Sequence, residues 1–559
     1  MSEKVNFLYQ QWLNLAVDDE DVVNELKDIN GNETEVSDRF YKDLEFGTGG
    51  LRGKLGAGTN RMNIYTVRKT TLGLAAYLSN NYTTPSVAIS YDSRRKSHLF
   101  AKETAQVFIS CGIHVKMYDR LMPTPMLSFA IRHLECSAGV MITASHNPAE
   151  YNGYKVYGAD GCQITDNAAA AITKCIASAD PFSQSKFSPA TTLQSSKLFE
   201  EISQSVIEQY YNAILTERVG NPKQKDLSIV YSPLHGSGLE PVMATLKMAG
   251  YTNIKVVPNQ KEPNGNFPTC PYPNPELPEA LSEGIKFLSE VGGDLLLATD
   301  PDCDRVGVVS EGYVLSGNEI GILLLDYICK SRIGNSTMPN NPIAIKTIVT
   351  TQMAEKVAKQ YGVELINVLT GFKYIGEYIG QLEGNGEENR YIFGFEESCG
   401  YLSGTYARDK DAVNAVLLIC DMAAHYMESG ITLAEKLMSL YETHGFYECA
   451  LDSFAFEGES GLAAMKNLTD SLRNEAPDSV FGIPAKKCID YLDTAQTKGL
   501  PKSNVLEYTL TDNTLLTVRP SGTEPKMKIY YQVTRNSKNE AQKALNSLRK
   551  KISKLFQEA

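Results

Sequence analysis

The sequence predicts an α/β protein of four domains, with three consecutive doubly wound mixed α/β domains and a C-terminal α+β domain. Its 559 residues exceed what a single hydrophobic core supports. From residue 86 onward, short apolar runs alternate with longer segments of helical period, which is the pattern of β-α-β units. Toward the C-terminus the pattern changes to adjacent strands followed by a basic helix, which is typical of an α+β domain.

The composition and the N-terminus predict a cytoplasmic protein whose main partner is neither nucleic acid nor an anionic membrane. With 42% hydrophobic residues, 21% charged residues and a formal charge of −12, the chain argues against nucleic acid or an anionic membrane as a partner. The first residues lack the cationic start and apolar core of a signal peptide, and no window of about 18 apolar residues occurs. Eleven cysteines, without a CxxC pair, indicate reduced core residues rather than disulfides or a zinc site.

Three series of strands and helices carry the α/β prediction. The expected strands are 86–92, 113–119 and 138–144, then 227–233, 253–258 and 294–300, then 342–351, 363–371 and 391–398. The expected helices are 97–112, 126–134, 240–250, 275–292, 353–362, 372–382 and 411–430. Several of them end in a glycine, as expected where the chain turns with positive φ: Gly112, Gly250, Gly362 and Gly430. We expect largely parallel sheets in these three regions.

The C-terminal region predicts adjacent antiparallel strands. The segments 505–521 and 526–534 alternate in strand fashion, and Asp512-Asn513 marks a turn inside the first of them. A basic helix over 539–559 follows.

The first of four unusual loops is TASHNP, residues 143–148, which follows an apolar strand. In open α/β sheets, ligands collect at the carboxyl ends of the strands. The loop lacks the GxSxG pattern of α/β-hydrolases, so an ordinary serine hydrolase is disfavoured. A turn whose side chains bind only local backbone groups is the alternative.

The second loop, DPDCDR over 300–305, places three carboxylates at alternate positions behind the strand DLLLAT. Such carboxylates repel one another unless a cation neutralises them, and Mg²⁺ is the natural hard cation for oxygen ligands. The loop has neither the glycine nor the glutamate of an EF-hand. A solvated acidic loop is the alternative.

The third and fourth loops suit a sugar and a phosphate. GFEESCG, residues 394–400, offers carboxylates and a serine to sugar hydroxyls, although a plain acidic turn would look similar. RPSGTEP, residues 519–525, combines a guanidinium, two hydroxyls and a glycine in a cradle for a phosphate dianion. A hairpin turn with Arg519 in a salt bridge is the alternative. Together the four loops favour phosphoryl transfer on a sugar phosphate, with Ser145 carrying the phosphate.

These motifs resemble those of the α-D-phosphohexomutases, the superfamily of phosphoglucomutase and phosphomannomutase. The resemblance extends over nearly the whole chain, in ten ordered motifs: GTGGLRG (47–53), YDSR (91–94), TASHNP (143–148), NGYKVY (152–157), PLHG (233–236), DPDCDR (300–305), TGFKYIG (370–376), GFEES (394–398), RDKDA (408–412) and RPSGTEPK (519–526).

The resemblance implies four domains around a central cleft, each contributing one loop. We place them at 1–205 with the phosphoserine loop, 206–317 with the Mg-binding loop, 318–440 with the sugar-binding loop and 441–559 with the phosphate-binding loop.

The resemblance also implies the site residues. The implied metal site holds one Mg²⁺ with Ser145, Asp300, Asp302 and Asp304. The implied catalytic residues are Ser145, His146, Lys155, Arg52 and Lys410, where the general base stays open between the two lysines and His146 serves either catalysis or loop organisation. The implied substrate-binding residues are Glu396, Ser398, Arg305, Lys373, Arg519, Ser521, Gly522 and Thr523.

The function implied is that of a phosphoglucomutase, acting on α-D-glucose 1-phosphate and glucose 6-phosphate through a phosphoserine and glucose 1,6-bisphosphate as activator and intermediate. The form GFEESCGYL resembles the branch that contains phosphopentomutase-like enzymes, glucose-1,6-bisphosphate synthases and bacterial α-phosphoglucomutases. Mannose or pentose phosphates are the alternative substrates. Two further alternatives are an aspartyl-phosphate enzyme of the haloacid-dehalogenase type, with Asp300 as nucleophile, and a non-catalytic sugar-phosphate-binding protein. We expect a monomer or weak dimer.

Overall fold

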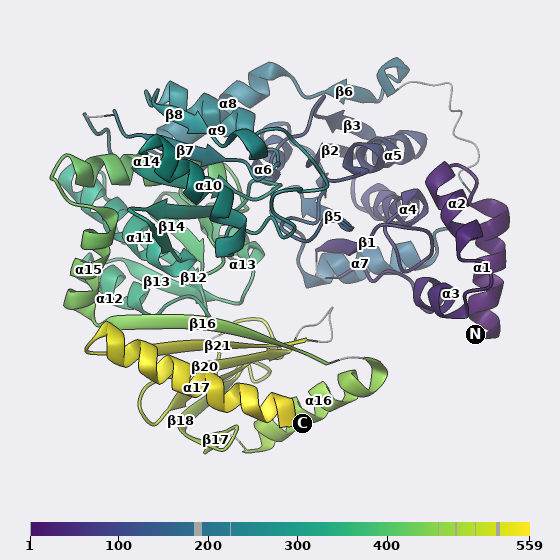
Figure 1. The fold of residues 1–559 in the computed structure, drawn as a ribbon. Coiled ribbons are helices and arrows are strands. Elements are labelled where there is room, and N and C mark those ends of the chain that lie inside the picture. The colour runs from purple at the N-terminus through teal and green to yellow at the C-terminus, as the bar shows by residue number, and fades with distance from the viewer. Residues whose placement is uncertain are drawn as a thin grey trace. The chain divides into compact units, whose positions relative to one another are not determined.

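The computed structural model describes residues 2–47, 49–183, 193–223, 225–456, 458–475, 478–497, 499–520 and 526–558. Helices and strands alternate along most of this length (Figure 1). The chain forms two compact units: unit 1 comprises Met1–Leu315, Ile375–Tyr391 and Cys399–His425, and unit 2 comprises Ser316–Tyr374, Ile392–Ser398 and Tyr426–Ala559. Within the part of the chain that the model describes, no helix is both long and apolar enough to cross a bilayer.

The first sheet of unit 1 has the strand order β1-β5-β4-β2-β3-β6. Its strands are β1 (Gly50–Lys54), β2 (Ser86–Tyr91), β3 (His114–Met117), β4 (Ala138–Ile142), β5 (Tyr151–Gly158) and β6 (Phe199–Glu201). The accompanying helices are α4 (Ile64–Asn81), α5 (Ser97–Ser110), α6 (Thr124–His133) and α7 (Asp166–Ala177). The predicted strands and helices between residues 86 and 144 are confirmed.

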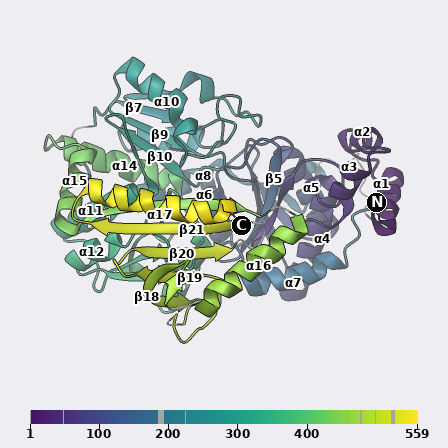
Figure 2. The same cartoon turned by 60° about the horizontal axis from the view of Figure 1, so that its bottom comes forward.

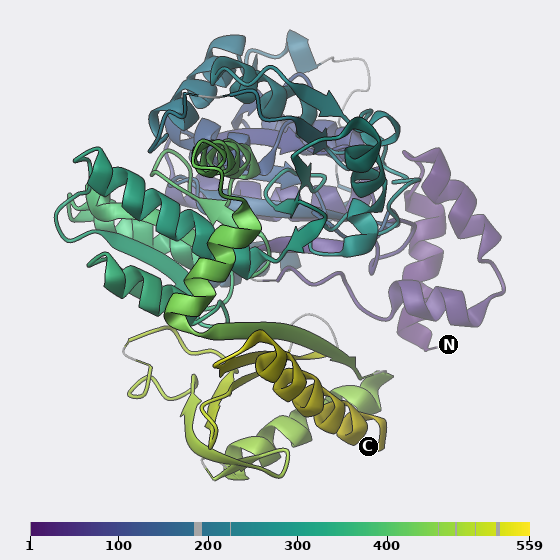
Figure 3. The same ribbon diagram turned by 60° about the vertical axis from the view of Figure 1, so that its left-hand side comes forward.

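Three N-terminal helices, which the sequence analysis did not predict, pack together beside this sheet: α1 (Glu3–Leu15), α2 (Glu20–Asp28) and α3 (Glu33–Phe40). They form the purple group in Figure 3. The ring of Trp12 lies 5.7 Å from that of Phe40 and 5.3 Å from that of Tyr65 in α4. This aromatic cluster joins the three helices to the core of the first sheet.

The second sheet of unit 1 has the order β11-β10-β9-β7-β8. Its strands are β7 (Ile229–Ser232), β8 (Ile254–Val256), β9 (Leu295–Thr299), β10 (Val306–Ser310) and β11 (Tyr313–Leu315), and the helices of this region are α8 (Gln204–Thr216), α9 (Leu239–Met248) and α10 (Pro278–Val291). Unit 1 also contains β15 (Gly400–Leu402) and most of α13 (Phe372–Gly384) and α14 (Ala412–Met427).

The expectation of largely parallel sheets was wrong for one edge of both sheets in unit 1. β5 runs antiparallel to β4 and to β1, and β10 runs antiparallel to β9 and to β11. The reason is the length of two connections, 143–150 and 300–305, which are too short for the crossover that parallel neighbours need. Each connection therefore stays at the carboxyl end of a central strand, and these are the two loops that carry Ser145 and the three aspartates.

Unit 2 contains the third series of strands, β12 (Ile343–Thr347), β13 (Glu364–Val368) and β14 (Tyr391–Glu396), in the order β13-β12-β14. β12 and β13 are parallel. The helices that belong to this region of unit 2 are α11 (Gly317–Gly334), α12 (Met353–Gln360) and α15 (Leu433–His444). The predicted strands and helices of this region are confirmed, and the glycines expected to end helices (Gly112, Gly250, Gly362 and Gly430) all have φ between 66° and 94°.

The C-terminal sheet of unit 2 is antiparallel, with the order β16-β21-β20-β19-β18-β17. Its strands are β16 (Phe446–Ala455), β17 (Ser479–Val480), β18 (Ile483–Asp490), β19 (Leu506–Leu510), β20 (Leu515–Pro520) and β21 (Lys526–Arg535). The helices α16 (Gly458–Glu475) and α17 (Lys538–Glu558) pack on it around a shared apolar core (Figure 2). The predicted turn is confirmed: Asn513 has φ 65°, and the Asp512 carboxylate accepts the Thr514 amide at 3.0 Å.

Candidate active site

Ser145 lies in the loop between β4 and β5, with its backbone in the left-handed region at φ 51°. Its side chain is 7% exposed, and its Oγ donates a hydrogen bond to Asp300 Oδ2 at 2.9 Å. The Nδ1 atom of His146 lies 3.2 Å from the same Oγ. A left-handed backbone at a non-glycine residue costs about 1 to 3 kcal/mol and is typical of functional sites. Here the turn directs the hydroxyl toward a buried carboxylate.

A single guanidinium, that of Arg94, holds the backbone of this loop. Its Nη2 donates to the carbonyl of Ser145 at 2.6 Å and to that of Asn147. Its Nη1 donates to the carbonyls of Pro148 at 2.9 Å and Tyr151 at 3.0 Å. The Arg94 side chain is buried, so these four bonds form away from competing solvent. The position of Ser145 is therefore set by a residue 51 positions earlier in the chain.

Asp92 supports the same loop from the end of β2. Its Oδ2 accepts the Thr143 hydroxyl at 2.6 Å, and that hydroxyl accepts the Ser145 amide at 2.7 Å. Its carboxylate also lies 3.4 Å from the Arg94 guanidinium. Both residues belong to the motif YDSR, for which no role was predicted. The available signal was a charged pair directly after an apolar strand.

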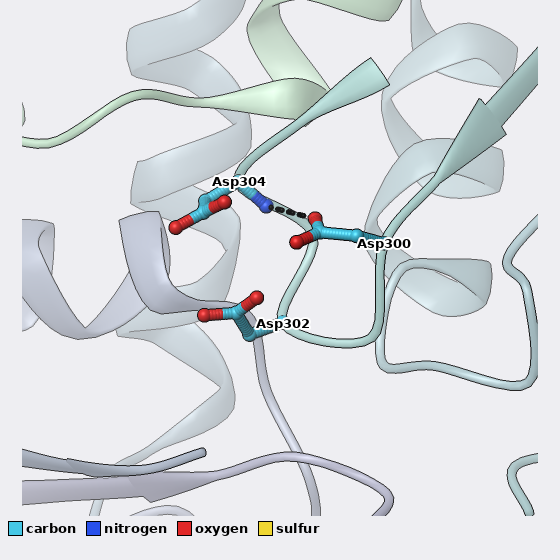
Figure 4. A group of neighbouring side chains, drawn as sticks. All are labelled: Asp300, Asp302 and Asp304. Carbon is cyan, nitrogen blue, oxygen red and sulfur yellow. Dashed lines mark hydrogen bonds between the residues drawn. The ribbon is translucent and has the colours of Figure 1, made fainter. Parts of the chain in front are cut away.

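The carboxylates of Asp300, Asp302 and Asp304 converge in the loop after β9 (Figure 4). All three residues are fully buried, and one oxygen from each lies within 4.8 Å of the others. Asp300 Oδ1 accepts the backbone amides of Asp304 and Arg305, both at 3.0 Å. The Oδ1 atoms of Asp302 and Asp304 have no hydrogen-bond partner in the described residues. Buried, orphaned carboxylate oxygens at this spacing fit a hard divalent cation.

Burial and neighbouring charges shift the pKa values of Asp300 and Asp302 in opposite directions. Burial, together with repulsion from Asp304 and Asp302, raises the pKa of Asp300 well above 3.8. Burial alone would also raise the pKa of Asp302, but the ammonium group of Lys155 outweighs it and holds that pKa below its ordinary value. At Asp300, burial and carboxylate repulsion thus outweigh the opposing charge of Arg305.

Two lysines from different parts of unit 1 neutralise the group. Lys155 Nζ lies 2.8 Å from Asp302 Oδ2 and 3.5 Å from Asp304 Oδ2. Lys410 Nζ lies 2.9 Å from Asp304 Oδ2. Burial lowers the pKa of Lys155, but Asp302 and Asp304 outweigh this and raise it above 10.5. Without a competing cation, Lys155 therefore holds its proton, which counts against it as the general base in this state.

Two arginines and a histidine flank the aspartates and Ser145. Arg305 pairs with Glu276, and its Nε lies 3.9 Å from Asp304 Oδ1. Arg52 is exposed and donates to the Asn147 side chain at 3.1 Å. Burial, with repulsion from Arg305 and Arg52, lowers the pKa of His146 well below 6.5, so its imidazole is neutral near pH 7.

In unit 2, the predicted sugar-binding residues lie at the carboxyl end of β14. Glu396 is buried, and its Oε1 accepts the backbone amide of Gly371 at 3.0 Å. Ser398 is half-buried. Lys373, in the first turn of α13, has its Nζ 4.9 Å from the ring centroid of Tyr374. The motifs TGFKYIG and GFEES therefore meet through a direct hydrogen bond.

Glu397, which the sequence analysis left without a separate role, is held by two threonines. Its Oε2 accepts the hydroxyls of Thr347 at 3.1 Å and Thr350 at 3.0 Å. The buried ammonium of Lys346 donates to the Thr350 carbonyl at 3.1 Å and so orders the same turn. No motif marked these threonines, because residues 342–351 were expected to form one continuous strand, whereas β12 ends at Thr347.

Arg519, at the end of β20, lies near the loop with Glu396 and Glu397 within unit 2. Burial and the charge of Glu397 raise the pKa of Tyr530, whereas the nearby Arg519 guanidinium opposes the rise. Tyr530 thus lies close to both the glutamates and Arg519. Ser521, Gly522 and Thr523, predicted to complete the phosphate cradle, fall outside the described residues.

Three family models match the chain in order. Domains I, II and III of phosphoglucomutase/phosphomannomutase, each an α/β/α domain, match residues 43–182, 208–313 and 316–444. The chain belongs to this phosphoglucomutase/phosphomannomutase family. Its relatives include a phosphoglucomutase of Staphylococcus epidermidis, which is 37% identical over 533 residues, covering 92% of this chain and 96% of that protein. Family membership makes the protein an isomerase that transfers phosphoryl groups on sugar phosphates.

Solved structures of the phosphoglucomutase/phosphomannomutase family share the fold. The open form of parafusin, a phosphoglucomutase from Paramecium, is similar with a TM-score of 0.67 at 18% identity, over 92% of this chain and 96% of that one. N-acetylphosphoglucosamine mutase from Aspergillus fumigatus is similar with a TM-score of 0.50 at 14% identity, over 99% of both chains. Within the described residues, each predicted domain contains one sheet, while the boundaries 205/206, 317/318 and 440/441 stay predictions.

If Arg94 positions the nucleophile loop of this phosphoglucomutase/phosphomannomutase family member, Arg94→Lys is expected to lower kcat about 100-fold. A lysine keeps the charge, but its single ammonium cannot span four carbonyl groups. Arg95→Lys is the matched control, because Arg95 donates to one exposed carbonyl, that of Ala149. Steady-state kinetics that show equal kcat for the two variants would contradict this role of Arg94.

Proposed function

We propose that the protein interconverts α-D-glucose 1-phosphate and glucose 6-phosphate by way of a phosphorylated Ser145. The observation that carries the proposal is the Ser145 Oγ placed 2.9 Å from Asp300 within the buried aspartate group. The 37% identity to a phosphoglucomutase over 92% of the chain supports glucose phosphate as substrate.

In the proposed reaction, phosphoserine 145 donates its phosphoryl group to the free hydroxyl of the hexose phosphate. The bond between phosphorus and the serine oxygen breaks, a bond to the sugar oxygen forms, and the hydroxyl proton passes to a base in the site. Glucose 1,6-bisphosphate then reorients and returns its other phosphoryl group to Ser145. Lys155 and Lys410 stabilise negative charge on the transferring group, and the neutral His146 orients the serine oxygen through its Nδ1.

Asp300, Asp302 and Asp304, with an oxygen of phosphorylated Ser145, are the proposed ligands of one Mg²⁺. Bound there, the ion supplies positive charge against the transferring phosphoryl oxygens. The two orphaned Oδ1 atoms support this assignment, because a cation would give each of them a partner. The structure of the Aspergillus N-acetylphosphoglucosamine mutase was determined with GlcNAc-6P and magnesium, which supports a metal and a sugar phosphate as ligands here.

Glu396 and Ser398 are the proposed hydroxyl-binding residues. Arg519, with Ser521, Gly522 and Thr523, is proposed to bind the phosphate that does not react, and Arg305, Arg52 and Lys373 to contribute further positive charge. Specificity then depends on hydroxyl contacts that serve the sugar in both of its orientations.

Replacing Arg519 by alanine is expected to raise the KM for glucose 1-phosphate, because a charged hydrogen-bonded pair contributes about 2 kcal/mol. Arg519→Lys keeps the charge but loses the planar fork, so its KM should lie between those of the wild type and Arg519→Ala. Initial-rate kinetics give both values. A KM that stays at the wild-type value in Arg519→Ala would exclude Arg519 from phosphate binding.

The deciding experiment is a coupled assay of the purified protein with Mg²⁺ and trace glucose 1,6-bisphosphate. Glucose 1-phosphate, mannose 1-phosphate and ribose 1-phosphate are compared as substrates. The fastest turnover is expected with glucose 1-phosphate. A preference for mannose 1-phosphate would make the protein a phosphomannomutase by the same mechanism, and the family description favours that as the second candidate. Turnover of none of the three by phosphorylated protein would overturn the proposal.

Phosphate labelling separates the serine mechanism from an aspartyl-phosphate mechanism. Labelled glucose 1,6-bisphosphate should leave acid-stable label on Ser145, whereas label on Asp300 would be labile.

We further propose a cytoplasmic location and a monomer or weak dimer. Light scattering of the purified protein measures the oligomeric state.

A further inference from the structure

The segment 408–411, which carries Lys410, is anchored on both sides by buried groups of unit 1. On one side, the Arg408 amide donates to the hydroxyl of Ser128 at 2.8 Å. On the other, the Asp411 carboxylate accepts the hydroxyls of Tyr210 at 2.8 Å and Tyr406 at 2.7 Å. These bonds fix the ends of the segment. They leave open what directs the long side chain of Lys410 toward the aspartates.

Asp409 forms the contact between Lys410 and strand β5. Its Oδ1 accepts the Lys410 backbone amide at 2.9 Å and lies 3.4 Å from Lys410 Nζ. Its Oδ2 accepts the hydroxyl of Tyr157 at 2.8 Å. Both Asp409 and Tyr157 are buried. Burial and the charge of Asp409 raise the pKa of Tyr157 well above 10, so its hydroxyl keeps the proton that it donates.

Strand β5 supports both lysines from one face. Residues 155 and 157 point to the same side of the strand, because side chains alternate along a strand. Lys155 contacts Asp302 and Asp304 directly, whereas Tyr157 reaches the site through Asp409 and Lys410. Tyr154 lies on the opposite face, where its hydroxyl pairs with that of Thr71 in α4 at 3.1 Å.

We propose that Tyr157 is a positioning residue for phosphoryl transfer: its hydrogen bond fixes the Asp409 carboxylate, which in turn holds the Lys410 ammonium 2.9 Å from Asp304. This inference rests on the proposed function, since it concerns the same site. Without the tyrosine hydroxyl, the Asp409 carboxylate is free to rotate and to draw the Lys410 ammonium away from Asp304. The position of a charge that stabilises the transferring group then becomes less defined, and misplacement of this kind reduces turnover rather than substrate binding.

The test compares Tyr157→Phe with Tyr154→Phe in steady-state kinetics with glucose 1-phosphate. Each variant loses one buried hydroxyl from the same strand, so any general effect on the strand is shared. Tyr157→Phe is expected to lower kcat about 10- to 100-fold with little change in KM, as for other groups that orient an active-site residue. Tyr154→Phe is expected to keep wild-type kcat. Melting temperatures of the two variants should fall by similar amounts.

Asp409→Asn is the second variant, and it keeps the test decisive if Tyr157→Phe does not fold. The Oδ1 of asparagine can still accept the Lys410 amide and its Nδ2 can donate to the Tyr157 oxygen, but the charge that holds Lys410 is lost, so the same fall in kcat is expected. Wild-type kcat in Tyr157→Phe, or equal losses of kcat in the Tyr157 and Tyr154 variants, would overturn the inference. An inactive wild type would instead overturn the proposed function, which keeps the two failures distinct.

Discussion

Ser145→Ala is expected to lower mutase activity by about four orders of magnitude or more, because the group that forms and breaks the phosphate bond is lost. The fold should persist. The Ser145 amide keeps its bond to Thr143 and its carbonyl keeps the bond to Arg94, neither of which involves the hydroxyl. The loss of one hydrogen bond to Asp300 costs about 1 kcal/mol of stability.

The measurement is the coupled assay, combined with thermal unfolding and transfer of label from glucose 1,6-bisphosphate. Ser145→Ala should accept no label and should unfold within a few degrees of the wild type. Mutase activity within tenfold of the wild type would exclude Ser145 as the phosphate carrier, and a variant that retains label at Asp300 would support the aspartyl-phosphate alternative.

Asp300→Asn is expected to remove activity and at the same time to raise the melting temperature of the EDTA-treated protein. Asparagine Oδ1 can still accept the amides of Asp304 and Arg305, so the loop keeps its shape. The change removes a buried charge that two neighbouring carboxylates repel, and sites selected for function commonly give up stability in this way. Mg²⁺ should raise the melting temperature of the wild type much more than that of the variant.

The gain in stability of Asp300→Asn in EDTA should increase with pH. The pKa of Asp300 is raised in the folded protein, so its ionised form costs stability, and this cost is absent at a pH below the unfolded value. The advantage of Asp300→Asn in EDTA should therefore be largest above the raised pKa, shrink as the pH falls below it, and vanish below the unfolded value. The charge-matched control is Asp294→Asn, which removes an exposed carboxylate directly before β9. A variant no more stable than the wild type in EDTA at pH 7 would contradict the repulsion.

The sequence predicted parts of the candidate site whose residues are close together along the chain. Three aspartates at alternate positions behind an apolar strand predicted a cation site, and the structure brings these carboxylates together because Asp300 binds the amides of Asp304 and Arg305 while Cys303 adopts φ 51°. Strand ends and glycine-terminated helices were likewise predictable from local periodicity. The serine loop was located for the same reason.

Contacts between distant segments were not predictable from local pattern. Arg94 binds carbonyls more than 50 positions away, and Lys410 reaches Asp304 from a segment with no periodic signal. The strands β5 and β10 were not among the expected strands, although the short connections 143–150 and 300–305 that make them antiparallel to their neighbours are visible in the sequence. The three N-terminal helices were missed although their buried residues recur at helical spacing: Val5, Tyr9 and Trp12 in α1, Val22 and Leu26 in α2, and Val36 and Phe40 in α3.

The binding of four carbonyl groups by Arg94 fixes the loop that carries Ser145, the proposed phosphoryl donor. A serine held in this way cannot travel between the two ends of a hexose. The bisphosphate must therefore reorient in the site, while the serine keeps its position. Substitutions in the serine loop should thus alter the speed of each transfer but not the fraction of bisphosphate that escapes between transfers, which depends on how firmly the sugar is retained as it turns.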